Sequence, residues 1–130
     1  MRDDPSTPRG ELTTRTVAMP RDTNPSGDIF GGWLMSQMDI AGGACATSRA
    51  RGRVATVAVE GMVFHAPVHV GNVLCCYAEI KKVGTTSITI RLEAWALRQD
   101  TGKRVKVTEG IFTYVALDAA GKKRPVPPEA

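Results

Sequence analysis

A carboxylate interrupts an otherwise apolar stretch of the chain. Asp39 follows Met38, and Gly42 and Gly43 stand three and four residues further along. A glycine inside a helix costs about 1 kcal/mol relative to alanine, so two of them beside an acid suggest that a ligand or another backbone approaches closely there. That combination is typical of an active site. A partly exposed acid, with glycines that serve helix–sheet packing, is the alternative.

The loop before this stretch, residues 20–32, carries a second set of functional groups. Asn24 supplies an amide that polarises a carbonyl group without titrating, and Gly31 and Gly32 stand where a helix begins. Glycines at such an entrance let backbone N–H groups face a ligand, where the helix dipole favours negative charge. These groups are suited to an oxyanion hole. Ordinary turn chemistry is the alternative, with Asp28 as a helix cap.

The other reactive side chains predict neither a metal site nor a covalent nucleophile. Pro67 prevents a helix between His65 and His69, and in an extended chain these two lie roughly 13 Å apart. We therefore expect no metal and no cofactor. Cys45 lies in the apolar stretch, where a thiolate is disfavoured, and no nucleophile-elbow or phosphate-loop motif is present. His65 is a weaker catalytic candidate.

One helix and five strands must position these residues. The segment 33–49 repeats apolar side chains at helical spacing, and Gly52 follows it as a helix stop. The predicted strands are rich in β-branched residues: 11–19, 53–64, 72–83, 86–97 and 103–117. Short turns between the later strands require antiparallel pairing. The pattern predicts an α+β fold, a long central helix on a curved antiparallel sheet. Because one helix covers only part of such a sheet, we also expect oligomerisation.

Composition limits the classes of protein to consider. With 130 residues the chain forms one domain, expected over 11–120, with flexible segments at 1–10 and 121–130. A net charge of +4 with only 5% aromatic residues argues against nucleic-acid binding. No apolar run of about 20 residues and no signal peptide are present, so we expect no membrane partner. Three cysteines without a disulfide pattern predict a cytoplasmic protein.

Four stretches together resemble the YciA-like acyl-CoA thioesterases, which have the hotdog fold: "MPRDTNPSGDIFGGWLMSQMD", "GRVATVAVEGMVF", "VGNVLCCYAEI" and "KVGTTSITIRLEAW". The likeness covers about residues 11 to 127. It implies hydrolysis of acyl-coenzyme A, with Asn24 and Asp39 forming the site from opposite subunits of a homodimer, which in this family often assembles into a trimer of dimers. Asp39 would then be the general base, or less favourably the nucleophile, and the Gly31 and Gly32 amides would bind the thioester oxygen.

Coenzyme A would belong to the substrate rather than act as a cofactor. Basic and turn residues are the candidates for its nucleotide, namely Arg53, Lys82, Gly84, Thr85 and Ser87. Backbone groups of Val57 and Val59 are the candidates for its pantetheine arm. The tail "KKRPVPPEA" offers no C-terminal helix, which family members can carry. Two other functions remain open, a hotdog hydratase or dehydratase acting on acyl-CoA and a non-catalytic acyl-CoA-binding regulatory module.

Overall fold

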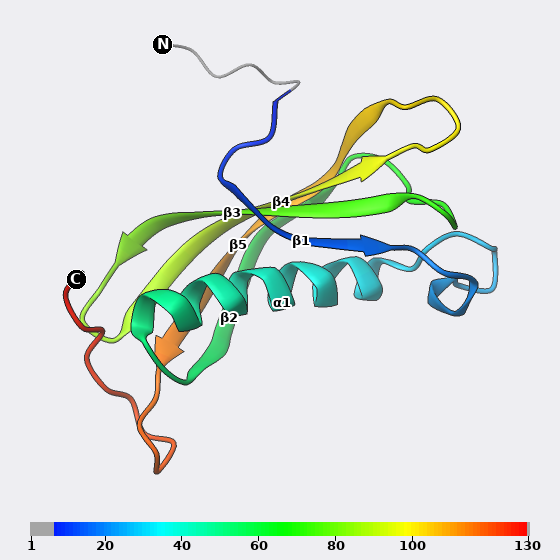
Figure 1. The fold of residues 1–130 in the computed structure, drawn as a ribbon. Helices are drawn as coiled ribbons and strands as arrows, with labels where there is room; N and C mark the ends of the chain where they lie inside the picture. The colour runs from blue at the N-terminus through cyan, green and yellow to red at the C-terminus, as the bar shows by residue number, and fades with distance from the viewer. Residues whose placement is uncertain (1–6, 130) are drawn as a thin grey trace.

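A single helix lies along one face of a five-stranded antiparallel sheet in the computed structural model, which describes residues 7–129 (Figure 1). The sheet order is β1-β3-β4-β5-β2. The elements are β1 (Glu11–Val17), a 3-10 helix (Pro20–Asp22), α1 (Gly31–Ala50), β2 (Val54–Phe64), β3 (Val73–Val83), β4 (Ser87–Leu97) and β5 (Arg104–Ala116). The predicted α+β architecture is confirmed, and the predicted boundaries lie within two residues of the observed ones.

The core fills the space between α1 and the inner face of the sheet. Alternation along β4 directs Ile88, Ile90 and Leu92 into this core, where all three are completely buried. Met38 and Ala41, at helical spacing on α1, are buried against them. One face of α1 is therefore packed, while Met35 and Ile40 on its other side remain exposed. Among residues 7–129, no helix combines the length and apolarity that crossing a bilayer requires.

The end of α1 differs in detail from the prediction. The residue in the left-handed conformation is Arg51, with φ 53°, rather than Gly52. Gly52 adjoins the guanidinium of Arg124, and a Cβ there would lie 2.6 Å from Nη2. That guanidinium donates to the main-chain oxygen of Ala50 at 2.9 Å and so satisfies one of the last carbonyls of the helix.

The C-terminal segment packs beside this helix end. Arg49 and Arg51 donate to main-chain oxygens of Pro127 and Pro128, at 2.5 and 2.6 Å. The amide of Val126 donates to the oxygen of Thr85. The segment expected to be a flexible tail thus makes several contacts, although residue 130, like residues 1–6, lies outside the described part of the chain. The expected domain boundaries stay a prediction.

Strand β2 forms one edge of the sheet and is poorly covered. It pairs only with β5 among the described strands, and Val57, Val59, Val63 and Phe64 are 38–55% exposed. Two register shifts interrupt its pairing, one between Thr56 and Ala58 and one between Glu60 and Val63. The expectation that one helix would leave apolar strand residues exposed is confirmed for this chain.

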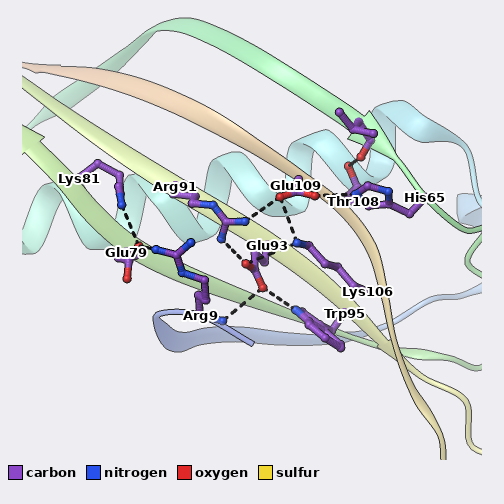
Figure 2. Close-up of polar contacts among 11 residues, drawn as sticks. Arg9, His65, Glu79, Lys81, Arg91, Glu93, Trp95, Lys106, Thr108 and Glu109 are labelled. Atoms are coloured by element: carbon purple, nitrogen blue, oxygen red, sulfur yellow. Dashed lines mark hydrogen bonds and ion pairs between the residues drawn. The ribbon is translucent and has the colours of Figure 1, made fainter. Parts of the chain in front are cut away.

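The outer face of the sheet, opposite α1, carries a cluster of charged residues (Figure 2). At its centre, Glu93 is only 2% exposed. Its carboxylate accepts hydrogen bonds from Arg91, from the Trp95 indole at 2.9 Å and from the Arg9 amide at 3.3 Å. Glu109 connects Arg91 with Lys106 and with His65. Residue 9 therefore fastens the N-terminal segment onto β4.

Glu93→Gln is expected to lower the free energy of unfolding at pH 7 by about 2 kcal/mol, because Arg91 and Trp95 lose charge-assisted hydrogen bonds to a buried carboxylate while Arg91 keeps its pair with Glu109. Burial raises the pKa of Glu93, but hydrogen bonds from Arg91 and Trp95 outweigh it and hold the pKa below its ordinary 4.5. The stabilisation is therefore present above pH 4.5 and is lost as the pH falls through the folded-state pKa. Urea unfolding at fixed protein concentration measures it. Glu79→Gln, a more exposed carboxylate, is the control, and an equal loss in both variants would contradict the assignment.

Candidate functional site

Asp39 lies in the middle of α1, half-buried, with its side chain directed at β2 and β5. Thr56 of β2 donates its hydroxyl to Oδ1 of Asp39 at 2.7 Å. Tyr114 of β5 donates to the same oxygen at 3.0 Å and also approaches the main-chain oxygen of Asp39 at 3.1 Å. Within the described residues, both side-chain hydrogen bonds to this carboxylate end on Oδ1. The second oxygen, Oδ2, is therefore available to a ligand or a water molecule.

Gly42 makes the contact with Tyr114 possible. A Cβ at this position would lie 2.2 Å from the Tyr114 hydroxyl oxygen and 2.7 Å from Cδ1 of Leu92. At Gly43 the nearest atom would be Cε2 of Tyr114, at an ordinary 3.9 Å. The close approach suggested by the glycine pair is thus made at Gly42 by a side chain of the sheet. Gly42 therefore both allows the helix to pack against the sheet and lets Tyr114 reach Asp39.

Asn24 is held by the turn that it helps to form. Its side-chain oxygen accepts from the amides of Ser26 and Asp28, at 2.9 and 3.2 Å. Gly27 has φ +88°, which the turn requires and which few other residues adopt. Because the carbonyl end of the Asn24 amide is fixed by these bonds, its NH₂ end points away from them. The residue therefore combines the turn role with a donor that a ligand can use.

The start of α1 has no side-chain cap. Phe30 occupies the cap position, so the alternative that Asp28 caps the helix is wrong. No acidic residue lies in the first turn. The first N–H groups of a helix have no partners within it, and here they include those of Gly31 and Gly32. Gly32 also leaves room for the Phe30 ring, whose Cε2 atom would lie 2.6 Å from a Cβ.

An apolar groove of about 460 Å³ adjoins this helix start. It is bordered by Gly31 and Leu34 on α1, by Ile29 before it, and by residues 64–68, at the end of β2 and just after it. His65 in this segment hydrogen-bonds Glu109 at 2.6 Å, so the cluster on the outer face accounts for this histidine. Nδ1 of His69 lies 3.8 Å from Oδ1 of Asp28. The expected lack of a metal and of a cofactor stays a prediction.

Within one chain the candidate groups do not meet. Asp39 lies eight residues into the helix from Gly31, which places it about 12 Å along the helix axis from the uncapped amides. The segment before α1, residues 23–30, which contains Asn24, lies beyond that same end of the helix (Figure 1). A single carbonyl group cannot contact both ends of such a span. Asp39 on one side and Asn24, Gly31 and Gly32 on the other therefore lie in two separate places in the chain, and each place is a candidate half-site.

The candidate coenzyme A residues lie mostly at the opposite end of α1. The main-chain oxygen of Arg53 accepts from the amide of Leu117, and that of Thr86 accepts from the amide of Ala116, so the start of β2 and the β3–β4 turn lie on the two sides of the end of β5. The oxygen of Thr85 accepts from Val126 in the C-terminal segment. Gly84 and Ser87 close that turn, and Lys82 is exposed just before it. Val57 and Val59 are exposed on edge strand β2.

Sequence reasoning missed Thr56 and Tyr114. Both lie in strands that read as ordinary β-branched or aromatic segments, and nothing in their spacing connects them with residue 39. The one available signal was Gly42, which marks a place where a large side chain approaches the helix. Which side chain approaches depends on how β5 lies against the helix, and no local sequence pattern predicts that placement.

The matching family model covers residues 26–103 and describes the thioesterase superfamily. An acyl-CoA thioester hydrolase YciA of Salmonella typhimurium is 58% identical over 125 residues, 94% of each chain. The chain belongs to the thioesterase superfamily, among the YciA-like hydrolases.

Solved structures of this superfamily match the fold closely. A hexameric thioesterase from Yersinia pestis is 57% identical, with a TM-score of 0.91 over 95% of this chain and 100% of that one. A hexameric hotdog fold thioesterase of Campylobacter jejuni is 41% identical, with a TM-score of 0.86 over 91% of each chain. The fold of this thioesterase superfamily member is therefore the hotdog fold, as the resemblance implied.

A more distant acyl-CoA hydrolase, from Staphylococcus aureus, was solved as an asparagine-to-alanine variant with coenzyme A and as an aspartate-to-alanine variant. Its chain is 27% identical to this superfamily member. The asparagine variant matches with a TM-score of 0.82, and the match covers 88% of this chain and 68% of that chain. The aspartate variant has a TM-score of 0.79.

Proposed function

We propose that this protein hydrolyses the thioester of acyl-coenzyme A, with Asp39 as the general base. The observation that carries the proposal is the environment of Asp39, whose Oδ1 is fixed by two hydroxyl donors while Oδ2 is left for a water molecule. The high identity to YciA acyl-CoA thioester hydrolases supports the same reaction. A general base must hold its acceptor atom in a defined place within hydrogen-bonding reach of the water.

The proposed reaction needs no covalent intermediate. Oδ2 of Asp39 takes a proton from water as the water oxygen bonds to the thioester carbon. The carbonyl oxygen becomes an oxyanion, which accepts hydrogen bonds from the Gly31 and Gly32 amides and the Asn24 NH₂ group. Each such donor contributes about 3 kcal/mol in enzymes with comparable sites. When the C–S bond breaks, the thiolate of coenzyme A leaves and the Asp39 carboxyl group returns the proton to it. Attack by Asp39 itself, through an anhydride, is the less favoured route.

We propose that each site is shared by two subunits, Asp39 from one and Asn24, Gly31 and Gly32 from the other. The separation of about 12 Å along α1 within one chain supports this, because the two half-sites need a second copy to meet. The exposed apolar edge of β2 supports a dimer that covers it. Related thioesterases are hexamers, which favours a trimer of dimers here.

The Staphylococcus aureus enzyme adds support for the two residues. Its substituted asparagine and aspartate are fifteen residues apart, the same separation as Asn24 and Asp39. For the nucleotide of coenzyme A, the proposed contacts are Arg53, Lys82 and the turn formed by Gly84, Thr85 and Ser87. For the pantetheine arm they are the Val57 and Val59 backbone groups. A cytoplasmic location also remains a proposal.

Release of free thiol tests the reaction. The purified protein, given acyl-CoA substrates of increasing chain length and a thiol-reactive dye, is expected to release one coenzyme A per substrate consumed. A hydratase or dehydratase would alter the acyl group without releasing thiol. A binding module would change neither, although acyl-CoA would still raise its melting temperature. Absence of thiol release from every chain length would overturn the proposed function.

A further inference from the structure

We propose that Tyr114 is the positioning residue that selects which oxygen of Asp39 reacts, and that Gly42 supplies the space that admits its hydroxyl. This inference rests on the proposed function, because it concerns the geometry of the proposed base. It adds two residues, Gly42 on α1 and Tyr114 on β5, that position the reacting group without reacting themselves. Neither residue contacts the thioester in the proposed mechanism.

Tyr114 is the more rigid of the two donors to Oδ1. It is 1% exposed, and its ring stacks on Phe112 of the same strand, with ring centroids 6.5 Å apart. Thr56, by contrast, lies on edge strand β2 beside a register shift and is exposed in the single chain. A donor fixed by packing within its own chain holds its acceptor more accurately than one on an irregular edge strand. Tyr114 therefore sets the side-chain rotation of Asp39, and Thr56 completes the pair of hydrogen bonds.

The hydroxyl acts as a donor rather than as an acid. Burial and the neighbouring charge of Asp39 raise the pKa of Tyr114 well above its ordinary value of 10.0. The group therefore remains protonated at neutral pH and can donate its proton to Oδ1. Because Oδ1 accepts both hydrogen bonds, the lone pairs of Oδ2 are the ones left free. Oδ2 is therefore the oxygen that takes the proton from water.

Gly42 is what allows the hydroxyl to reach Asp39 from the sheet. With alanine at this position, its Cβ would lie 2.2 Å from the Tyr114 hydroxyl oxygen and 2.7 Å from Cδ1 of Leu92, so both side chains would have to move. Tyr114 cannot move far, since Phe112 and the core surround it. The effect of Gly42→Ala on catalysis should therefore pass through the hydroxyl of Tyr114. That dependence is measurable as a coupling between the two positions.

A double-mutant cycle tests the inference. Tyr114→Phe should lower kcat about tenfold with KM changed less than about twofold, the loss expected for one hydrogen bond that matters to the base. Gly42→Ala should lower kcat similarly. In the double variant, kcat should fall no more than about threefold below that of Tyr114→Phe. Gly43→Ala is the matched control, because its added methyl meets only an ordinary contact, and it should retain wild-type kcat.

The outcomes separate this inference from the proposed function. Loss of turnover in Asp39→Asn together with full kcat in Tyr114→Phe would overturn the positioning role and leave the proposed function in place. A lower melting temperature with unchanged kcat would overturn it too, since that result marks a purely structural tyrosine. Additive losses in the cycle would show that Gly42 does not act through the hydroxyl. Should Gly42→Ala fail to fold, the kcat and KM of Tyr114→Phe still decide the role of Tyr114.

Discussion

Asp39→Asn is expected to fold, to bind acyl-CoA and to hydrolyse it at least roughly 100-fold more slowly than the wild type. The asparagine oxygen can still accept the hydrogen bonds of Thr56 and Tyr114, so the side chain keeps its orientation. Its NH₂ group then replaces Oδ2, and an amide nitrogen takes no proton from water. The substitution therefore removes the base and leaves the geometry of the site in place.

The measurement is kcat from thiol release, together with binding of a non-hydrolysable acyl-CoA analogue by calorimetry. Asp100→Asn, an exposed acid in the β4–β5 turn, is the matched control and should retain full activity. Turnover near the wild-type rate in Asp39→Asn would remove Asp39 from the mechanism. Weakened binding of the analogue with unchanged kcat would assign Asp39 to substrate binding instead.

Two inactive variants should restore activity when their subunits mix. In a mixed dimer of Asn24→Ala and Asp39→Ala, one shared site inherits both substitutions and the other inherits neither. Random pairing makes half of the dimers mixed, each with one intact site of two, so roughly a quarter of wild-type activity should return. The separation of the two half-sites along α1 is the structural reason for this expectation.

The experiment requires refolding the two variants together at equal amounts, with mass spectrometry to confirm that mixed species form. Each variant refolded alone is the control and should remain inactive. Verified mixed dimers without activity would mean that Asn24 and Asp39 serve the same subunit's site, or that one of them has no role. Either finding would overturn the shared site.

The fold was predictable because its signals are local. Alternation of apolar residues along β4, helical spacing of Met38 and Ala41, and short turns between strands each depend on neighbours in the sequence. The stop of α1 was placed one residue late, because Arg51 adopts the left-handed conformation that glycine usually takes. Gly52 instead adjoins the side chain of Arg124, which is distant in sequence.

The candidate site was predictable in part. Asp39, Asn24 and the glycine pair stand out by residue type, and their roles stay predictions. Thr56 and Tyr114 could not be found in this way, because their contact with Asp39 depends on how two strands lie against the helix. The same holds for Glu93, which lies in a run of alternating residues yet is buried among charged groups. Partners that are distant in sequence leave no periodic signal.

Strand β2 has a consequence for the newly made subunit. Before the proposed dimer covers it, its apolar edge offers unpaired backbone groups to any extended chain, which makes aggregation the competing reaction during synthesis. The two register shifts in β2 break the flat, regular edge that such misassembly requires, and Glu60 places a charge between them. Irregular pairing at this edge thus protects the unassembled chain while Thr56, beside the first shift, faces Asp39.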